Sequence, residues 1–324
     1  MSISQLIRRR DQVTISWLSQ ILNQEVRRID ADCESANWSN QVLIRAEMSD
    51  GTTRSLRLKI CLGDTFGRSE VDYYTKDYAS MIEAPIVPCF DAHFESGSGY
   101  HILLRDLSDS HVDNKLLQPS LGYGLEVAKA LGRLHAHHWC TRACPEVSAL
   151  DRYFNEIRPG VQPMERVTGR AYRKRFESHE EAFRRRWTSP LGMSLLHGDL
   201  NPTNILTSVV DCAPVYFIDR QPFSWSLTYG VAVSDLAYLM VPWWPEGMMQ
   251  ICQLEILRCW YDSLGVVDYS WSEARADWRL SVEQCLAVPL EWCSKPDTLF
   301  GMQWLWNTQL ARIDSALQFH SNQS

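Results

Sequence analysis

The sequence predicts an α+β fold in two lobes, a small β-rich N-terminal lobe and a larger, mainly helical C-terminal lobe. Strand-like alternation flanks an Asp-Gly turn in the first third of the chain, and helical spacing dominates after residue 107. The 324 residues are 45% hydrophobic and 22% charged, a globular composition that suits one large domain or two lobes with a shared cleft. We place the boundary so that the lobes are residues 1–106 and 107–324.

The N-terminal lobe begins with apolar side chains at roughly helical spacing, which predicts a helix over about the first 30 residues. Two strand-like runs then flank the Ser49-Asp50-Gly51 turn, and alternation on both sides of such a turn is typical of a β-hairpin. The elements expected after the first helix are two hairpin strands, one helix and two more strands: Gln41–Met48, Arg54–Ile60, Thr65–Glu83, Ile86–Phe94 and Tyr100–Leu104.

The C-terminal lobe is expected to contain an amphipathic helix, a charged helix, two short apolar strands and a long helical tail. Arginines in residues 166–186 are interleaved with glutamates, which predicts a solvated helix face and leaves contact with an acidic substrate or RNA as the alternative. These elements are expected at Leu121–Trp139, Glu165–Trp187, Met193–Leu196, Val215–Ile218 and from Asp235 onward.

Composition also argues against several classes of protein. The formal net charge of -7 argues against a nucleic-acid partner, since nucleic-acid binders usually have a strongly basic surface. The ten cysteines form no C-x-x-C pair, and the first residues lack the apolar core of a signal peptide, so reduced thiols in a cytoplasmic protein are expected. No apolar run approaches the roughly 20 residues that a membrane span needs.

The segment His197-Gly198-Asp199-Leu200-Asn201-Pro202-Thr203-Asn204 carries the strongest chemical signal, and a short apolar run ending at Asp219 follows it. Phosphoryl transfer needs a residue that orients and deprotonates the acceptor, and ligands for a metal on the phosphates. Asp199 supplies a base, and the oxygens of Asn204 and Asp219 suit a hard cation such as Mg²⁺. The alternative is a solvated Asn-Pro turn with capping aspartates.

HGDLNPTN resembles the catalytic loop H-G-D-x-x-x-x-N of the aminoglycoside phosphotransferase and choline kinase-like superfamily, whose members are distant relatives of protein kinases. The resemblance implies a bilobal protein-kinase-like fold in which Asp199 is the catalytic base and Asn204 and Asp219 bind magnesium. It implies that His197 supports the loop. The segments EVDYY, LHA and FIDRQ resemble the ecdysteroid kinase-like and choline kinase-like branch more than the aminoglycoside-resistance enzymes. The resemblance covers roughly residues 30–240.

The same resemblance implies a nucleotide site in the N-terminal lobe. Lys59 lies on the second hairpin strand, where the family keeps its phosphate-binding lysine, and Glu70 falls on the next helix. An ion pair between these two residues is expected to aim the ammonium at the nucleotide phosphates. The alternative for each residue is an ordinary solvated charge.

Two further segments are expected to touch the nucleotide. The phosphate-covering loop falls within residues 35–40 and has no glycine, so Asn37 and Ser39 are candidates for phosphate contact, with an ordinary polar turn as the alternative. The segment ILLRDL resembles the family's lobe-connecting strand, which implies that backbone groups around Arg105 and Leu107 bind the adenine edge.

Three other features leave alternatives open. One feature is a cluster of histidines and cysteines. The L-x-x-L-H-A match implies that its helix packs beneath the catalytic loop, and the alternative is a metal site, although the spacing of the ligands is not a familiar one. Asp235 is expected to brace that loop or to cap its own helix. Arg220 is expected either to touch a phosphate or an anionic acceptor, or to form a buried ion pair. The cluster comprises His135, His137, His138, Cys140 and Cys144.

We therefore expect a Mg²⁺-dependent kinase that transfers the γ-phosphoryl group of ATP or GTP to a hydroxyl-type group of a small molecule. The tryptophan-rich C-terminal lobe is expected to hold a cationic or aromatic acceptor, and the sequence leaves open which of its tryptophans line the pocket. The alternatives are a catalytically inactive kinase fold that binds a ligand, and a protein kinase.

Overall fold

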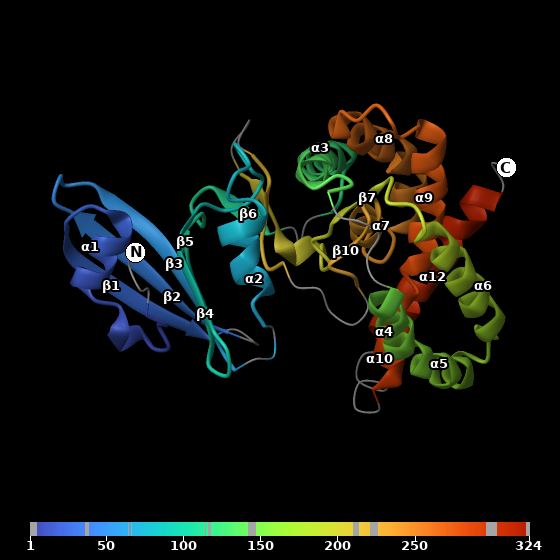
Figure 1. Ribbon diagram of the computed structural model, residues 1–324, viewed down its shortest axis with the longest axis horizontal. Coiled ribbons are helices and arrows are strands. Elements are labelled where there is room, and N and C mark those ends of the chain that lie inside the picture. Colours follow the sequence, from blue (N-terminus) through green and yellow to red (C-terminus); the bar gives the residue numbers. More distant parts are fainter. Residues whose placement is uncertain are drawn as a thin grey trace. The chain divides into compact units, whose positions relative to one another are not determined.

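The computed structural model describes residues 5–35, 39–63, 65, 67–113, 115, 118–141, 147–209, 214–220, 226–295 and 303–321. The chain forms two compact units: Met1–Val112 with Leu206–Gln221, and Asp113–Ile205 with Pro222–Ser324 (Figure 1). The first is mainly an antiparallel sheet and the second is mainly helical, so the expected α+β class is confirmed. The lobe boundary between residues 106 and 107 stays a prediction.

The first unit is built on a five-stranded sheet in the order β1-β2-β3-β5-β4, in which every neighbouring pair is antiparallel. The expected hairpin is confirmed: β2 and β3 pair so that Lys59 lies opposite Gln41, and Gly51 in the turn has a φ of 82°. The strands are β1 Val26–Ser35, β2 Asn40–Met48, β3 Thr53–Leu62, β4 Cys89–Glu95 and β5 Gly99–Arg105.

The expected helix over the first 30 residues is wrong in its extent. A 3₁₀ turn, η1 (Arg10–Gln12), precedes α1 (Ile15–Leu22), and residues from Val26 onward form β1. Thr14 caps the start of α1 by accepting a hydrogen bond from the Trp17 amide, and Asn23 ends it in the left-handed conformation. The buried Leu18 of α1 then joins the core formed by the inward-facing residues of β2 and β3.

The expected helix over Thr65–Glu83 is shorter than predicted. It comprises α2 (Ser69–Asp72) and one π-helical turn, η2 (Tyr73–Asp77). A second sheet of this unit has the order β6-β8-β9, and the amide of Phe217 in β9 donates to the Pro85 carbonyl at 2.8 Å. That bond fastens the segment leading to Asp219 onto the chain that follows η2. The strands are β6 His111–Asp113, β8 Ile205–Ser208 and β9 Tyr216–Phe217.

The second unit is mainly helical and includes a two-stranded antiparallel ribbon of β7 and β10, which lies beside α3 and α7 (Figure 1). Helices α3 and α8 approach closely at Gly132, where an added Cβ would lie 2.7 Å from the Trp260 carbonyl oxygen. The elements are α3 Leu121–His137, α4 Val147–Ile157, η3 Arg158–Gly160, α5 Val161–Thr168, α6 Arg173–Arg186, β7 Met193–Leu195, η4 Pro202–Asn204, β10 Tyr229–Val231, α7 Ser234–Met240, α8 Glu246–Leu264, α9 Trp271–Gln284, α10 Ala287–Ser294 and α12 Gln303–Ser321.

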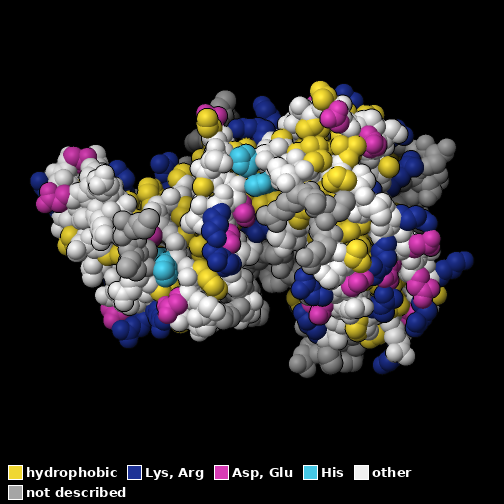
Figure 2. All heavy atoms as spheres, viewed as in Figure 1, with side chains coloured by type: hydrophobic (Ala, Val, Ile, Leu, Met, Phe, Trp, Pro, Cys, Tyr) yellow, Lys and Arg dark blue, Asp and Glu magenta, His cyan; other side chains and the backbone are white. Residues whose placement is uncertain are grey.

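The charged segment expected as one helix is two helices, because Gly169 adopts a left-handed conformation with a φ of 68° and ends α5. Arginines of α6 pair with acidic side chains, as Arg184 does with Asp151 and Glu180. Figure 2 shows basic and acidic side chains interleaved over this part of the unit. These pairs favour the solvated helix face over the alternative of contact with an acidic ligand.

Two compositional expectations also have a structural counterpart. The cysteines in the described ranges all carry free thiols. Within the same ranges, no helix is both long enough and apolar enough to cross a membrane.

Candidate active site

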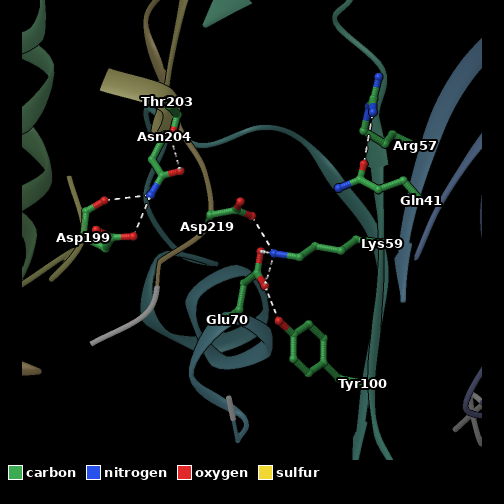
Figure 3. Close-up of polar contacts among 9 residues, drawn as sticks. All are labelled: Gln41, Arg57, Lys59, Glu70, Tyr100, Asp199, Thr203, Asn204 and Asp219. Carbon is green, nitrogen blue, oxygen red and sulfur yellow. Dashed lines mark hydrogen bonds and ion pairs between the residues drawn. The ribbon is translucent and has the colours of Figure 1, made fainter. Parts of the chain in front are cut away.

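Lys59 lies at the centre of a buried charge cluster in the first unit (Figure 3). Its Nζ is 2.8 Å and 3.0 Å from the two carboxylate oxygens of Glu70 and 2.6 Å from Oδ1 of Asp219. Tyr100 on β5 donates its hydroxyl to Glu70 Oε2 at 2.6 Å. The expected Lys59–Glu70 ion pair is therefore present, and Asp219 shares the same ammonium.

The cluster has a net negative formal charge, because one ammonium faces two carboxylates. Burial by itself would lower the pKa of Lys59, but Glu70 and Asp219 outweigh this effect and raise the pKa above its ordinary value. Burial raises the pKa of Glu70 to about 7, while the Lys59 ammonium opposes that rise. The Asp219 side chain is 42% exposed, so its carboxylate is the member of the cluster that solvent and solutes can reach.

Asp219 is held in an uncommon backbone conformation. Its φ of 58° is in the left-handed region, where residues other than glycine are infrequent and often functional. The next residue, Arg220, is 2% exposed; it donates to Ser69 Oγ at 2.9 Å and approaches the Asp77 carboxylate at 3.7 Å. Arg220 thus forms the buried ion pair named as its alternative, and it ties the Asp219 segment to the helix that bears Glu70.

Asp199 lies on the HGDLNPTN loop of the second unit and accepts three side-chain hydrogen bonds. Asn201 Nδ2 and the Tyr238 hydroxyl donate to Oδ1 at 3.1 Å and 3.2 Å. Asn204 Nδ2 donates to Oδ2 at 3.1 Å (Figure 3). Asn204 Nδ2 also donates to the Asp199 carbonyl at 2.7 Å. Because both partners are acceptors, the amide nitrogen of Asn204 faces Asp199 and its oxygen points elsewhere.

Asp235 braces this loop by accepting hydrogen bonds from its backbone. Its carboxylate accepts the amides of His197 at 2.7 Å and Gly198 at 3.0 Å, and His135 Nε2 lies 3.1 Å from Oδ2. Since Trp260 Nε1 donates to His135 Nδ1, the neutral ring must donate from Nε2. Burial would raise the pKa of Asp235, but the hydrogen bonds from His135 and from the Gly198 amide lower it below its usual value.

These bonds decide between the interpretations left open for Asp235 and His135. Asp235 braces the loop through hydrogen bonds, and His135 packs beneath that loop as the L-x-x-L-H-A match implies. In the described ranges, no group of three or more His, Cys, Asp or Glu residues is arranged to hold a metal. Cys144 lies outside those ranges.

The other residues predicted to contact the nucleotide lie before β2 and at the end of β5. Ser39 precedes β2 and is half-buried, whereas Asn37 lies outside the described residues. At the end of β5, the Arg105 amide donates to the Pro88 carbonyl at 2.9 Å, and the Leu107 carbonyl accepts from the Ser110 and His111 amides. These backbone groups of Arg105 and Leu107 are therefore already hydrogen-bonded within the unit.

Sequence reasoning missed several residues of the site. Tyr238 lies one helical turn after Asp235 on α7. Residues at this i+3 spacing share a face of a helix, and that spacing could have indicated that Tyr238 faces the loop together with Asp235. Asn201 was inside the recognised loop, and its side chain both bonds Asp199 and caps η4. Tyr100 gave no local signal, since its contact with Glu70 depends on the pairing of β3 with β5.

A cavity of about 30 Å³ lies beside the loop in the second unit, lined in part by Gly198 and Tyr238. Three polar atoms of its lining, Ser226 Oγ, Ser281 Oγ and Gln284 Oε1, have no hydrogen-bond partner among the described residues. Such atoms are costly to bury, so a cavity of this size suits one ordered water or one small hydroxyl-bearing group.

No protein-family model matches the chain, and no curated protein matches it. A search of solved structures found a macrolide 2'-phosphotransferase, MphH, from Brachybacterium faecium: 15% identity, 93% of this chain, 96% of that chain and a TM-score of 0.48. An aminoglycoside-3'-phosphotransferase of type VIII is 17% identical; the match covers 78% of this chain and 93% of that chain, with a TM-score of 0.47. An aminoglycoside phosphotransferase, APH(3'')-Id, from Streptomyces rimosus is 14% identical; the match covers 81% of this chain and 92% of that chain, with a TM-score of 0.46.

At these identities, the likeness to the three structures concerns the fold alone. All three TM-scores are below 0.5, so any assignment of activity depends on the side chains described above. The nearer resemblance to the ecdysteroid kinase-like branch stays a prediction.

Proposed function

We propose that the chain is a Mg²⁺-dependent phosphotransferase that moves the γ-phosphoryl group of ATP or GTP to a hydroxyl group of a small molecule. The observation that carries the proposal is the Lys59–Glu70–Asp219 cluster, in which Lys59 and Glu70 are buried. A buried glutamate that binds the lysine ammonium fixes its position, so that it can contact phosphate oxygens as kinases require. A merely solvated lysine, the alternative weighed from the sequence, is excluded by its burial.

In the first unit, each member of the cluster has a distinct proposed role. Lys59 binds nucleotide phosphates, Glu70 orients it, and Asp219 is a metal ligand. Asn37 and Ser39 are proposed phosphate contacts, and backbone groups near Arg105 and Leu107 are proposed adenine contacts. Since the Arg105 amide and the Leu107 carbonyl are already bonded internally, base recognition falls to other groups of that segment.

The donor atoms fit magnesium. Mg²⁺ prefers oxygen ligands and is usually bound by one or two carboxylates together with substrate phosphates. Asp219 offers a half-exposed carboxylate in a cluster of net negative charge, and the Asn204 amide points its oxygen away from Asp199. When bound, the ion would neutralise charge that develops on the transferred phosphoryl group.

Asp199 is the proposed base. Hydrogen bonds from Asn201, Asn204 and Tyr238 fix the position of its carboxylate, which then accepts the proton of the acceptor hydroxyl. The brace from Asp235 holds the loop backbone in place. The unpartnered polar atoms beside Gly198 and Tyr238 supply neutral hydrogen-bonding groups for a hydroxyl-bearing acceptor.

Isothermal titration calorimetry with Mg-ATP and Mg-GTP tests the nucleotide part of the proposal. Wild-type protein should bind at least one nucleotide in the presence of Mg²⁺, and removal of Mg²⁺ with EDTA should weaken binding at least tenfold. Asp219→Asn should lose most of this metal dependence, and asparagine tolerates the left-handed backbone at this position. The matched control Asp262→Asn, on the exposed face of α8, should behave as wild type. Absence of binding to both nucleotides would contradict the proposal.

A further inference from the structure

A second cavity in the second unit, of about 120 Å³, is lined by none of the residues to which the proposed reaction assigns a role. It lies among the segment that precedes α3, the HGDLNPTN loop and the residues that follow α7. We call it the aromatic cavity. Its lining includes Lys115, Pro119, Tyr123, Pro202, Trp243 and Trp244.

The walls of the aromatic cavity are flat rings. Tyr123 stacks on Trp244 with ring centroids 6.0 Å apart, and Trp243 meets Tyr238 edge-on at 6.2 Å. An engineered cavity of ~150 Å³ in another protein binds benzene, so a volume of about 120 Å³ suits a single six-membered ring. Stacked and edge-on arrangements with aromatic walls would favour a planar ring over a saturated one.

The polar groups of the cavity favour an anion over a cation. Trp243 Nε1 is buried and finds no hydrogen-bond partner among the described residues. Lys115 is the one charged residue in the described lining, and no ion pair joins its side chain to another described residue; Asp113 Oδ1 accepts its backbone amide at 3.2 Å. An indole N–H and an ammonium are both donors, and the amide of Gln118, which also belongs to the lining, can donate as well as accept. The described lining includes no carboxylate.

We propose that the aromatic cavity binds a small aromatic carboxylate, with the ring between the aromatic walls and the carboxylate on Trp243 Nε1 and Lys115. Pro202 belongs to the loop of Asp199, and Trp243 contacts Tyr238, which donates to Asp199. The occupant therefore lies against the loop of the proposed base. The site depends on the cavity alone and stands whether or not the chain transfers phosphate.

Isothermal titration calorimetry with benzoate as the probe tests this site. Wild-type protein should bind benzoate saturably, and the neutral isostere benzamide should bind at least fivefold more weakly, because it carries no charge for Lys115. Lys115→Gln should weaken benzoate binding roughly fivefold and leave benzamide unchanged. Trp243→Phe keeps a ring and removes the N–H, so it should weaken benzoate at least fivefold.

Two matched variants serve as controls: Lys174→Gln on α6 and Trp304→Phe, whose side chain on α12 is 68% exposed. Both should bind benzoate as wild type does. The proposal is overturned if wild-type protein shows no saturable binding at millimolar benzoate. It is overturned equally if benzamide binds as tightly as benzoate, or if the cavity variants bind as tightly as the controls. Circular dichroism of each variant separates loss of binding from loss of fold.

Discussion

Lys59 Nζ lies 2.6 Å from Asp219 Oδ1, although 160 positions of sequence separate the two residues. Both belong to the first unit, because Leu206–Gln221 returns to it after the chain has passed through the HGDLNPTN loop. The ammonium and the proposed metal ligand are thus held on one body, with Arg220 and Phe217 fixing the returning segment. Arrival of a nucleotide phosphate would give Lys59 a new partner and release the Asp219 carboxylate for a cation.

The Lys59–Glu70 pair gives the first prediction. Lys59→Met leaves the Glu70 carboxylate buried without its cation, so we expect the free energy of unfolding to fall by about 3 kcal/mol in urea titrations. Lys59→Met with Glu70→Met removes both charges and should recover at least half of that loss. Both variants should lose nucleotide binding. A single variant as stable as wild type would show that the pair is not coupled as described.

The brace from Asp235 gives the second prediction. Asp235→Ala leaves His135 and two loop amides without their acceptor, and we expect a loss of about 3 kcal/mol in urea unfolding. Asp235→Asn keeps one acceptor oxygen and should lose less. Asp262→Ala removes an exposed pair with Arg258 and should change stability by at most about 0.5 kcal/mol. Equal effects of the two alanine substitutions would contradict the brace.

The elements and residues that could be predicted from the sequence are those with local signals. The Asp-Gly turn and the alternation around it identified the β2–β3 hairpin, and the spacing within HGDLNPTN identified Asp199 and Asn204 as neighbours. The first helix was overextended because apolar residues of β1 happen to continue a helical spacing. Helix α1 ends at Leu22 because Asn23 adopts the left-handed conformation, which cannot be read from the sequence.

Contacts between distant elements could not be predicted in the same way. Tyr100 reaches Glu70 because β3 pairs with β5, and Trp260 reaches His135 because α8 packs on α3. In both cases the partner is set by tertiary packing, for which a single sequence offers no spacing rule. The family resemblance supplied Lys59, Glu70 and Asp219 as a set, and the structure then placed them together.

A pH dependence follows from His179 on α6. Burial, with a contribution from Arg175, lowers the pKa of His179 from 6.5 to about 4, and neither ring nitrogen finds a partner among the described residues. The unfolded chain therefore binds more protons between these values, so stability should fall as the pH drops from about 6.5 towards 4. At pH 5 this amounts to about 2 kcal/mol.

His179→Leu should remove that contribution, since Phe154 and Phe183 surround the ring with apolar surface. We expect urea midpoints of the variant and wild type to differ more at pH 5 than at pH 8, with the variant the more stable at pH 5. An equal difference at both values would contradict a buried neutral histidine.

Close packing of η3 against α10 gives a further prediction. An added Cβ at Gly160 would lie 1.7 Å from the Leu290 carbonyl oxygen, and a backbone atom cannot move aside cheaply. Gly160→Ala should therefore lower the free energy of unfolding by about 2 kcal/mol or more. At Gly247 on α8 an added Cβ would meet no atom within 4 Å, so Gly247→Ala should stabilise the protein by about 0.5 kcal/mol. Thermal unfolding of both variants would show shifts of opposite sign.

The most direct test of the central claim is nucleotide turnover by Asp199→Asn. Mg-ATP and Mg-GTP consumption would be followed with a panel of hydroxyl-bearing acceptors, and nucleotide affinity would be measured on the same samples. If Asp199 is the base, the variant should retain nucleotide affinity within about threefold and lose at least ~10²-fold in kcat. Turnover by Asp199→Asn at the wild-type rate would contradict the account, as would wild-type protein that binds nucleotide but transfers phosphate to neither water nor any acceptor.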